Sequence, residues 1–459
     1  MAGVGTAKRN RAKAAERRAD APPEAAGDSS PLDRFFGLTS AGSTVATELR
    51  AGVATFLTMA YIMFVNPTIL ERAGMDHGAV FVATCLAAAF GSLIMGLYAN
   101  YPIALAPGMG LNAYFAFTMV PELGGNWQLA LGCVFVSGLL FFALSLSPLR
   151  AWLIDAIPVS LKLGIAAGIG FFLALIALEN AGIVAAHPAT LVTLGDLGRP
   201  QAWLAVLGFL FIAGLALHKV PGAIILGVLA VTLAAVGLGL EPWHGIAAVP
   251  PSLAPVFLKM DVAGVFQLGA ITMTLTLLLV TIFDTTGTLI GVARQAKLLD
   301  QDGRLPRLRE ALLADSASAA LGGALGTSTN TAYIESAAGV EEGGRTGLTA
   351  VVVAILFLLS LFFAPIAETV PLFATAPALL FVACLMAASL GAFVWDDPTE
   401  YVPALIIVLM MPLSFSISIG IGLGFIAYVA LKALAGRFAE INAAVAVIAF
   451  AFLLKLAFT

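Results

Sequence analysis

Long apolar segments recur along almost the whole chain, and they constrain its fold more than any other feature. Fifteen apolar runs lie between residues 51 and 458 of the 459-residue sequence. A helix needs about 20 apolar residues to cross the hydrocarbon layer of a membrane, so these runs predict transmembrane helices. Hydrophobic residues make up 60% of the chain and charged residues only 11%, whereas soluble proteins carry about 25% charged residues. The sequence therefore predicts an all-α polytopic membrane protein with roughly 10–14 spans and no large soluble domain. It excludes a cytosolic enzyme, a disordered protein and a coiled coil.

The distribution of basic residues predicts the orientation of the chain. Six of the 23 Lys and Arg residues lie within the first 18 positions, and a polar stretch follows them. A cleaved signal peptide has an apolar core directly after its basic region, so none is expected. The positive-inside rule predicts instead that residues 1–31 form a disordered basic cytoplasmic tail of a multi-pass protein in the cell membrane. The basic segment 294–309 also falls on the cytoplasmic side if eight spans precede it. A nucleic-acid-binding arm is the less favoured alternative, and no nucleic-acid partner is expected.

Two segments, 103–115 and 324–339, differ from ordinary spans. Each begins with a short stretch rich in Gly and small or polar residues and then becomes a plausible short helix. They are the third and tenth apolar runs, so they should have opposite orientations, as a pair of inverted seven-span repeats would give them. Interrupted segments at matching positions of two halves indicate the binding site of a transporter. The alternative is that such breaks are frequent in membrane helices generally.

Polar side chains inside the apolar runs are the strongest functional candidates, because an Asp at the centre of a span costs about 2.5–3.5 kcal/mol on insertion scales. Asp284 lies deep in an apolar run, Glu335 lies in the second interrupted segment, and Asn112 occupies the matching place in the first. The structural alternative is that the local Thr residues satisfy Asp284 and that Asn112 simply bonds a neighbouring helix. The acidic connection 396–400 after the twelfth run is expected to be a solvated cytoplasmic loop.

No cofactor or metal ion is expected. The three cysteines have no CxxC spacing and the four histidines are scattered over predicted loops, so neither a disulfide framework nor a metal centre is indicated. The string that begins at Asp284 resembles the phosphorylation motif of pump ATPases, but Thr285 replaces the motif's Lys and no large ATP-binding domain is present. A GxxxxGK[ST] phosphate loop is also absent. ATP-driven transport is therefore disfavoured, which leaves coupling to an ion gradient or passive flux.

The chain resembles the adenine/guanine/hypoxanthine permease (AzgA-like) branch of the nucleobase–ascorbate transporter family. The resemblance covers the sequence from about residue 32 to residue 432, in order. It rests on five strings, which are FLTMAYIMFVNPTIL at 56–70, APGMGLNAYF at 106–115, FDTTGTLIG at 283–291, DQDGRLP at 300–306 and GTSTNTAYIESAAGV at 326–340. One departure is Asn330, where the family pattern has Thr. That difference leaves the fine substrate preference open.

The resemblance implies fourteen spans arranged as two inverted seven-span repeats, with short extended segments leading into half-helices at spans 3 and 10. A core domain would comprise spans 1–4 (residues 32–147) and spans 8–11 (residues 261–366). A gate domain would comprise spans 5–7 (residues 148–260) and spans 12–14 with the C-terminal hydrophobic segment (residues 367–459). The place of the last apolar run, 441–458, is left open. Family members commonly form homodimers through the gate, and the substrate binds between core and gate.

The resemblance places the purine-contacting positions on Asp284 in span 8, Glu335 in span 10 and Asn112 in span 3. A carboxylate can accept two adjacent N–H groups, so Glu335 is expected to pair with N1–H and the exocyclic amine of guanine, or with N1–H of hypoxanthine. Asp284 would accept another N–H or position Glu335, while the Asn112 amide can donate or accept. The remaining residues expected to line the site are Ala113, Thr285, Thr331, Ser336 and three aromatic residues that either stack on the base or merely pack, Tyr114, Phe115 and Tyr333.

The expected function is uptake of adenine, guanine or hypoxanthine with protons, by an elevator-like alternating-access mechanism in which the proton gradient replaces any cofactor. Low-dielectric surroundings favour the neutral form of an acid, so a proton on Asp284 or Glu335 would let the empty site close. The rivals are Na⁺ coupling and a same-fold transporter of uracil, xanthine or an inorganic anion, although two acids argue against an anion. An intramembrane aspartyl enzyme is disfavoured because no GxGD string is present. A purely structural protein would hardly retain two charges at membrane depth.

Overall fold

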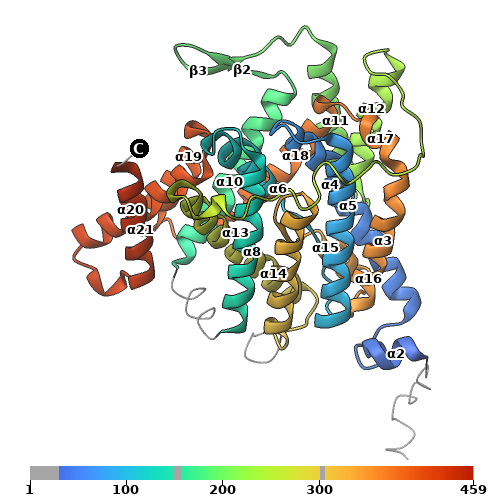
Figure 1. Ribbon diagram of the computed structural model, residues 1–459, viewed down its shortest axis with the longest axis horizontal. Helices are drawn as coiled ribbons and strands as arrows, with labels where there is room; N and C mark the ends of the chain where they lie inside the picture. The colour runs from blue at the N-terminus through green and yellow to red at the C-terminus, as the bar shows by residue number, and fades with distance from the viewer. Residues whose placement is uncertain (1–29, 148–156, 300–304, 458–459) are drawn as a thin grey trace, which may run out of the picture.

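The computed structural model describes residues 30–147, 157–299 and 305–457, and this part of the chain is almost entirely helical (Figure 1). The basic tail predicted for residues 1–31 lies outside the described residues except for its last two positions. Among the described residues, nine helical segments are long and apolar enough to cross a membrane. They are built from α3 (Val45–Met59) with α4 (Ile62–Glu71), α5 (His77–Ile94) with η1 (Met95–Ala99), α8 (Trp127–Leu146), α10 (Val159–Asn180), α11 (Pro200–Leu217), α13 (Leu268–Gln295), α16 (Gly347–Ser360) with η4 (Leu361–Phe363) and α17 (Ala364–Thr369), α18 (Leu372–Ala387) with η5 (Ala388–Ala392), and α20 (Ile417–Leu434).

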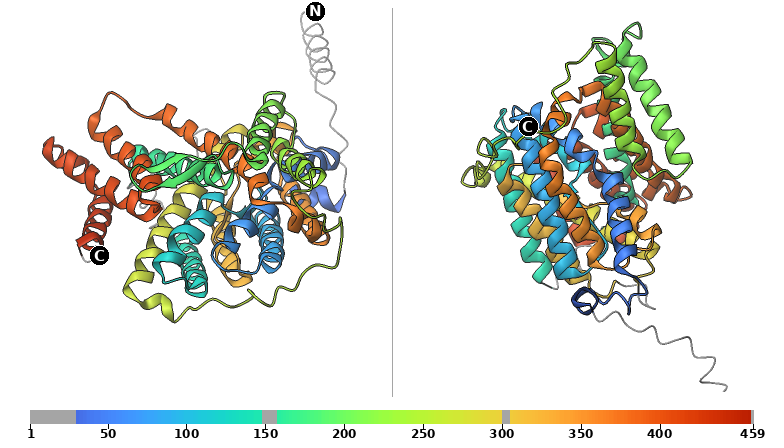
Figure 2. Two further views of the ribbon diagram at one scale, coloured as in Figure 1. Left: turned by 90° about the horizontal axis from the view of Figure 1, so that it is seen from above. Right: turned by 90° about the vertical axis from the view of Figure 1, so that its right-hand side faces the viewer.

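Shorter elements complete the helical body. The apolar run whose place the sequence left open forms a helix of its own, α21 (Ala443–Ala457), which packs on α20 at one edge of the molecule (Figures 1 and 2). The other short elements are α2 (Pro31–Phe36), α6 (Met109–Tyr114), η2 (Phe115–Met119), α7 (Val120–Glu122), α12 (Ala223–Gly237), η3 (Gly264–Phe266), α14 (Leu308–Leu325), α15 (Ser336–Glu341), α19 (Pro398–Ser414) and η6 (Phe438–Glu440).

Polar side chains fix where several apolar helices begin. The first N–H groups of a helix have no partner within it, and an unsatisfied group is costly in a membrane. Asp76 accepts a hydrogen bond of 2.7 Å from the backbone N–H of Ala79 at the start of α5, and Asn126 accepts one of 3.0 Å from Leu129 at the start of α8. Thr44, Thr346 and Ser416 play the same part for α3, α16 and α20. These caps set the helix starts from local sequence alone.

Two short strands cross in the interior of the helical body. Strand β1 (Leu105–Pro107) leads into α6, strand β4 (Asn330–Ala332) precedes α15, and the two strands pair antiparallel with Ala106 opposite Thr331. Every residue of both strands is buried. Extended backbone is tolerated at membrane depth only where its N–H and C=O groups are satisfied by protein, and here each strand satisfies the other. The crossing therefore brings together the two interrupted segments found in the sequence.

Helices α8 and α14 approach each other through glycine. A Cβ atom added at Gly138 would lie 2.4 Å from the backbone nitrogen of Ala320, and one added at Gly323 would lie 2.9 Å from the backbone nitrogen of Phe135. Membrane helices associate through small residues that let their backbones come close. This contact fixes α14 beside the strand crossing.

A second strand pair lies away from the crossing. Strands β2 (Val184–His187) and β3 (Leu191–Leu194) form an antiparallel hairpin with His187 opposite Leu191. Figure 1 shows this hairpin at the top of the molecule. Figure 2 shows α11 and α12 standing to one side of the helices formed by residues 45–147.

The acidic connection 396–400 is only partly the solvated loop that the sequence indicated. Asp396 is exposed, but Asp397 and Glu400 are partly buried in ion pairs. The ammonium group of Lys432 is fully buried and lies 2.6 Å from Oε1 of Glu400 and 2.7 Å from Oε2 of Glu440. Asp397 caps α19 and lies 2.6 Å from the Arg437 guanidinium. The local sequence did not reveal these pairs, because a buried ammonium group needs nearby acids and that lysine lies in another helix.

Candidate functional site

The strand crossing places the candidate residues around the start of two short helices. Asn112 lies in α6, Glu335 is the N-terminal cap residue of α15, and Asp284 lies in α13, which packs against β4. Gly108 lies directly before α6, and a Cβ atom there would lie 2.6 Å from Cγ2 of Thr331. Gly326 ends α14 with φ of +91°, a conformation that glycine adopts readily. These two glycines let the chain pass from helix to strand at the crossing.

Asp284 belongs to a chain of polar contacts that runs into the protein. The Thr331 hydroxyl donates to Oδ2 of Asp284 at 3.2 Å, and Oγ1 of Thr331 lies 3.0 Å from Oγ1 of Thr285. The Thr285 hydroxyl in turn lies 2.6 Å from Oδ2 of Asp315 in α14. Three of the predicted site residues are thus brought into direct contact.

Asp315 is a residue that the sequence reasoning missed. It is fully buried, and its second oxygen, Oδ1, forms no hydrogen bond with the described residues. The signal was present in the sequence, because Asp315 lies inside the apolar run 311–325 just as Asp284 lies inside its own. The polar Ser residues that surround Asp315 made that run look less apolar and concealed the acid.

Glu335 is held from the first transmembrane segment. The hydroxyl of Tyr61, in the break between α3 and α4, donates to Oε1 of Glu335 at 2.7 Å. The Thr58 hydroxyl donates to the Glu335 carbonyl at 3.3 Å. The carboxylate is therefore held by the Tyr61 hydroxyl and its own backbone, and no second side chain of the described residues bonds it.

A cavity of about 350 Å³ opens beside Glu335. Helices α3 and α15 line one side of it, while α18 and the turn between α11 and α12 line the other; its polar lining residues are Thr58, Lys219, Glu335, Glu341 and Glu342. Small-molecule sites typically measure about 300–1,000 Å³. The carboxylate thus has access to a space of ligand size.

Asn112 lies on another side of the crossing. It is fully buried, its Oδ1 accepts a hydrogen bond from the Ser328 hydroxyl, and its Nδ2 forms no hydrogen bond with any described residue. No hydrogen bond joins Asn112 or Glu335 directly to Asp284 within the described part of the chain. The three candidates are thus held by separate partners around one crossing.

Two further predicted site residues form hydrogen bonds between the two interrupted segments. The Tyr333 hydroxyl donates to the Pro107 carbonyl at 2.6 Å, and the Ser336 hydroxyl accepts from the backbone N–H of Ala104 at 3.0 Å. Both contacts join the segment around α15 to the segment around β1. The polar groups of Tyr333 and Ser336 are therefore occupied by structural hydrogen bonds.

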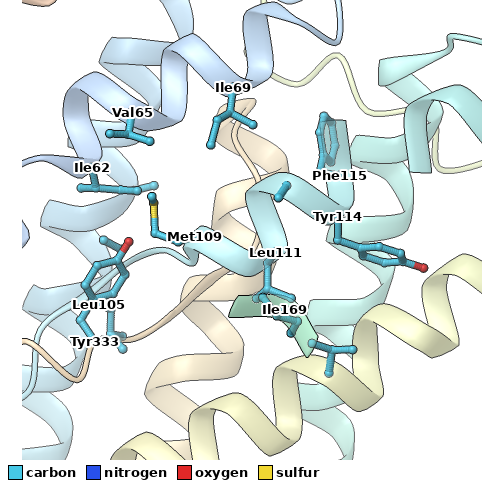
Figure 3. Close-up of a cluster of buried hydrophobic side chains, with 14 of the residues drawn as sticks. Ile62, Val65, Ile69, Leu105, Met109, Leu111, Tyr114, Phe115, Ile169 and Tyr333 are labelled. Atoms are coloured by element: carbon cyan, nitrogen blue, oxygen red, sulfur yellow. The ribbon is translucent and has the colours of Figure 1, made fainter. Parts of the chain in front are cut away.

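The remaining predicted residues lie in the apolar interior. Ala113, Tyr114 and Phe115 are fully buried, and the Tyr114 hydroxyl contacts the sulfur of Met273 at 3.2 Å. Figure 3 shows Met109 between Ile62 and Tyr333, and the Tyr114 hydroxyl directed away from them. The structure thus places Tyr114 and Phe115 as packing residues of the helix that carries Asn112.

Asn330 does not face the Asp284 side of the crossing. Its amide nitrogen donates to the Ala87 carbonyl at 2.7 Å and to the Ser318 hydroxyl at 2.9 Å. Successive residues of a strand point to opposite faces, and the neighbouring Thr331 contacts Asp284. The residue that departs from the family pattern therefore joins α5 to α14 instead of lining the site.

The acids of the site have no basic partner. None of the ion pairs within the described residues involves Asp284, Asp315 or Glu335. Ionisable residues inside a membrane usually pair or mark substrate and ion pathways. Lys219 lines the cavity beside Glu335, but within the described residues it forms no ion pair with that acid. The three acids therefore indicate a site that receives a partner from outside the chain.

Comparisons with known proteins show which proteins this chain resembles. The chain is 48% identical over 427 residues to the adenine permease AdeP of Escherichia coli (strain K12), which covers 93% of this chain and 96% of that protein. It is 46% identical over 430 residues to the guanine/hypoxanthine permease PbuO of Bacillus subtilis (strain 168), covering 92% and 99%. Its fold is similar to the transmembrane domain of a cyanobacterium bicarbonate transporter, BicA, with a TM-score of 0.62, 16% identity and coverage of 84% and 97%.

The family assignment rests on nearly the whole transmembrane body. The profile of the Permease family (Xan_ur_permease) matches residues 46–423, which include both interrupted segments and all the candidate acids. The relatives are matched over almost their full lengths. The chain is therefore an all-helical, multi-pass membrane protein that belongs to the Permease family.

Proposed function

We propose that this permease is a secondary active transporter that imports the purine nucleobases adenine, guanine and hypoxanthine together with protons. The observation that carries the proposal is Glu335, which lines a cavity of ligand size and whose carboxylate is held by the Tyr61 hydroxyl and by no side chain other than Tyr61 among the described residues. An ionised carboxylate only accepts hydrogen bonds, and purine bases present N–H groups along their edges. The names of the adenine and guanine/hypoxanthine permeases among the relatives support the same class of substrate.

Each candidate residue has a distinct role in the proposal. The Glu335 carboxylate accepts an N–H of the purine edge, and Asp284 accepts a second N–H of the base. The Asn112 amide nitrogen, which forms no hydrogen bond with the described residues, donates a hydrogen bond to a ring nitrogen or to O6 of the base. Thr331 and Thr285 position Asp284 through their hydroxyl contacts, while Ala113, Tyr114, Phe115, Tyr333 and Ser336 pack behind these residues and support them.

The proposed mechanism is elevator-like alternating access. In this scheme residues 32–147 and 261–366 form the core, and residues 148–260 and 367–459 form the gate, with fourteen spans in two inverted repeats. The cavity beside Glu335 supports the division, because α3 and α15 line its core side and α11, α12 and α18 line its gate side. The N-terminus is proposed to be cytoplasmic, and two copies are proposed to pair through the gate.

Proton coupling follows from the unpaired acids. A charge that is desolvated without a partner is costly, so the loaded site closes most readily when a proton neutralises one acid while the base donates N–H groups to another. Proton and base are then carried together, and both leave on the other side. Na⁺ coupling is the alternative, and an anionic substrate is disfavoured because the site presents acids.

The test is uptake of labelled hypoxanthine by the full-length protein in proteoliposomes with an imposed pH gradient. We expect competition by unlabelled adenine and guanine but not by uracil or xanthine, and loss of accumulation when a protonophore collapses the gradient. Glu335→Gln should abolish uptake, whereas the control Glu71→Gln, at an exposed position, should retain it. Uptake that persists in Glu335→Gln, or that ignores the protonophore, contradicts the proposed site or the proposed coupling respectively.

A further inference from the structure

Four side chains behind the site form one continuous row of oxygen atoms. Oδ2 of Asp284 lies 3.2 Å from Oγ1 of Thr331, that oxygen lies 3.0 Å from Oγ1 of Thr285, and the latter lies 2.6 Å from Oδ2 of Asp315. All three separations are hydrogen-bond distances. Asp315 and Thr285 are fully buried and Thr331 is 2% exposed, so bulk water does not separate these groups.

Counting hydrogen atoms along this row gives a definite protonation state. Three hydrogen bonds need three hydrogen atoms, and the hydroxyls of Thr285 and Thr331 supply only two. Ionised carboxylates supply none. With both Asp284 and Asp315 ionised, each hydroxyl would donate to its own acid, and the two hydroxyl oxygens would face each other at 3.0 Å with no hydrogen atom between them. One proton on either carboxyl group completes the row.

We propose that Asp284 and Asp315 share a single proton through Thr331 and Thr285, and that this is the proton transported with the substrate. The inference deepens the proposed purine–proton symport and rests on it. In one polarity the Asp315 carboxyl donates to Thr285, Thr285 donates to Thr331, and Thr331 donates to ionised Asp284. In the other polarity every one of these hydrogen bonds is reversed.

The two polarities interconvert by a balanced relay. The O–H bond of the Asp315 carboxyl breaks as its proton forms a new O–H bond on Thr285. Thr285 releases its own proton to Thr331, and Thr331 releases its own to Asp284. The products are a neutral Asp284, an ionised Asp315 and two intact hydroxyls, so one proton has moved and no oxidant, reductant or cofactor is required.

The position of the shared proton depends on whether a base is bound. Asp315 is fully buried, and among the described residues only the Thr285 hydroxyl and the backbone N–H of Ala332 act on its carboxylate, so the loss of hydration disfavours its ionised form. Asp284 is half-buried on the side of the site. An N–H donated by a bound base stabilises ionised Asp284 and holds the proton on Asp315. Departure of the base lets the proton pass to Asp284, the end of the row that is open to exchange.

The charged and titratable surroundings favour a single shared proton. The titratable groups that act on the row are the Glu335 carboxylate, the neutral Tyr333 phenol and the two aspartates themselves. The ammonium of Lys162 in α10 lies 5.6 Å from the centre of the Phe283 ring, one position before Asp284 in the sequence. Like charges this close disfavour simultaneous ionisation, and none of the described ion pairs relieves them.

Thr285→Val is the variant that separates the relay from substrate binding, because it replaces the hydroxyl with a methyl group of similar shape. Two rates are measured on the full-length protein in proteoliposomes: purine exchange at equal pH, and purine accumulation driven by a pH gradient. We expect the ratio of driven accumulation to exchange to fall at least about tenfold. Thr285→Ser, which restores a hydroxyl, should recover the ratio. Thr286→Val is the matched control, because the Thr286 hydroxyl donates to the Ile282 carbonyl of its own helix.

An infrared measurement tests the same proton without transport. The wild-type protein at neutral pH should show the carbonyl band of one protonated carboxylic acid that shifts when a purine is added. Asp315→Asn, whose amide can donate permanently to Thr285, should remove that shift. This readout remains available if Thr285→Val does not fold.

The outcomes separate the relay from the proposed function. A wild-type protein that exchanges no purine, or accumulates it independently of protons, overturns the proposed symport. A wild-type protein that couples normally, with an unchanged ratio in Thr285→Val, overturns the relay alone. The relay is also overturned if Thr286→Val lowers the ratio as much as Thr285→Val, or if the wild-type protein shows no protonated-acid band that responds to purine.

Discussion

The Tyr61 hydroxyl donates a hydrogen bond of 2.7 Å to Oε1 of Glu335, although the two residues are 274 positions apart in the sequence. Tyr61 is fully buried and lies in the break between α3 and α4. Glu335 occupies the position before α15, the short helix that follows the strand crossing, and its side chain forms no capping hydrogen bond with that helix. The carboxylate that we propose to bind substrate is therefore oriented by the first transmembrane segment.

This contact predicts the behaviour of Tyr61→Phe, which removes only the hydroxyl. A hydrogen bond to a charged group contributes about 1.5–3 kcal/mol, and without it the Glu335 side chain can leave the orientation that suits the base. We expect the KM for purine uptake to rise about tenfold or more, with a smaller change in the maximal rate. Tyr98→Phe, at an exposed tyrosine, is the control. An unchanged KM in Tyr61→Phe would show that Tyr61 does not position Glu335.

The close packing of α15 on α3 leads to a second prediction. A Cβ atom at Gly339 would lie 2.2 Å from Oγ1 of Thr55 and 2.5 Å from the Ala51 carbonyl oxygen. Overpacking a close contact costs about 1–3 kcal/mol, so Gly339→Ala should lower the melting temperature in detergent and weaken purine binding. Gly269→Ala, where an added Cβ meets nothing within 4 Å, should not lower stability. Equal melting temperatures for the two variants would contradict the close packing of α15.

Asn330 makes a prediction about specificity. Its amide nitrogen bonds the Ala87 carbonyl and the Ser318 hydroxyl behind the crossing. Asn330→Thr should therefore lower stability, by about 1–3 kcal/mol for the buried acceptor that loses its donor. The relative uptake of adenine, guanine and hypoxanthine should stay the same. A changed substrate ratio with unchanged stability would place Asn330 in the site after all.

The network at the end of α19 predicts a pH dependence of stability. Hydrogen bonds from Thr399 and Arg437 lower the pKa of Asp397 from its ordinary value to about 2, and Arg437 and Lys432 lower the pKa of Glu440 in the same sense. A depressed folded-state pKa stabilises the protein above the unfolded-state value. The contribution of Asp397 should be complete above pH of about 4 and should be lost progressively as the pH falls toward 2.

The measurement is thermal unfolding of the wild-type protein and of Asp397→Asn across this pH range. The wild-type protein should melt at the higher temperature above pH of about 4, and the difference should shrink as the pH falls. Asp196→Asn is a suitable control, because Asp196 forms an exposed pair with Arg199 in the loop before α11. A difference between wild type and Asp397→Asn that grows toward low pH would contradict the lowered pKa.

Local sequence accounts for the elements and for most of the polar candidates. Apolar runs predicted the helices, because backbone groups in a membrane must be satisfied within a segment. The two glycine-rich interruptions predicted breaks followed by short helices, and the family resemblance implied short extended segments before them; the strands β1 and β4 lie at these places. Asp284 and Glu335 were visible because charge is rare at such depth. Helix starts were also local, since capping side chains such as Asp76 and Asn126 lie next to the groups that they satisfy.

The sequence by itself determined a polytopic helical protein with two interrupted segments and at least two acids at depth. Only the tertiary structure decided which partners those acids have. Asp315 became part of the site because α14 packs through glycine against α8, and Tyr61 because the helix break turns its hydroxyl toward Glu335. Asn330 was assigned to a helix contact by the face on which its strand presents it. Such contacts join residues hundreds of positions apart, so they depend on how the helices pack and leave no local pattern in the chain.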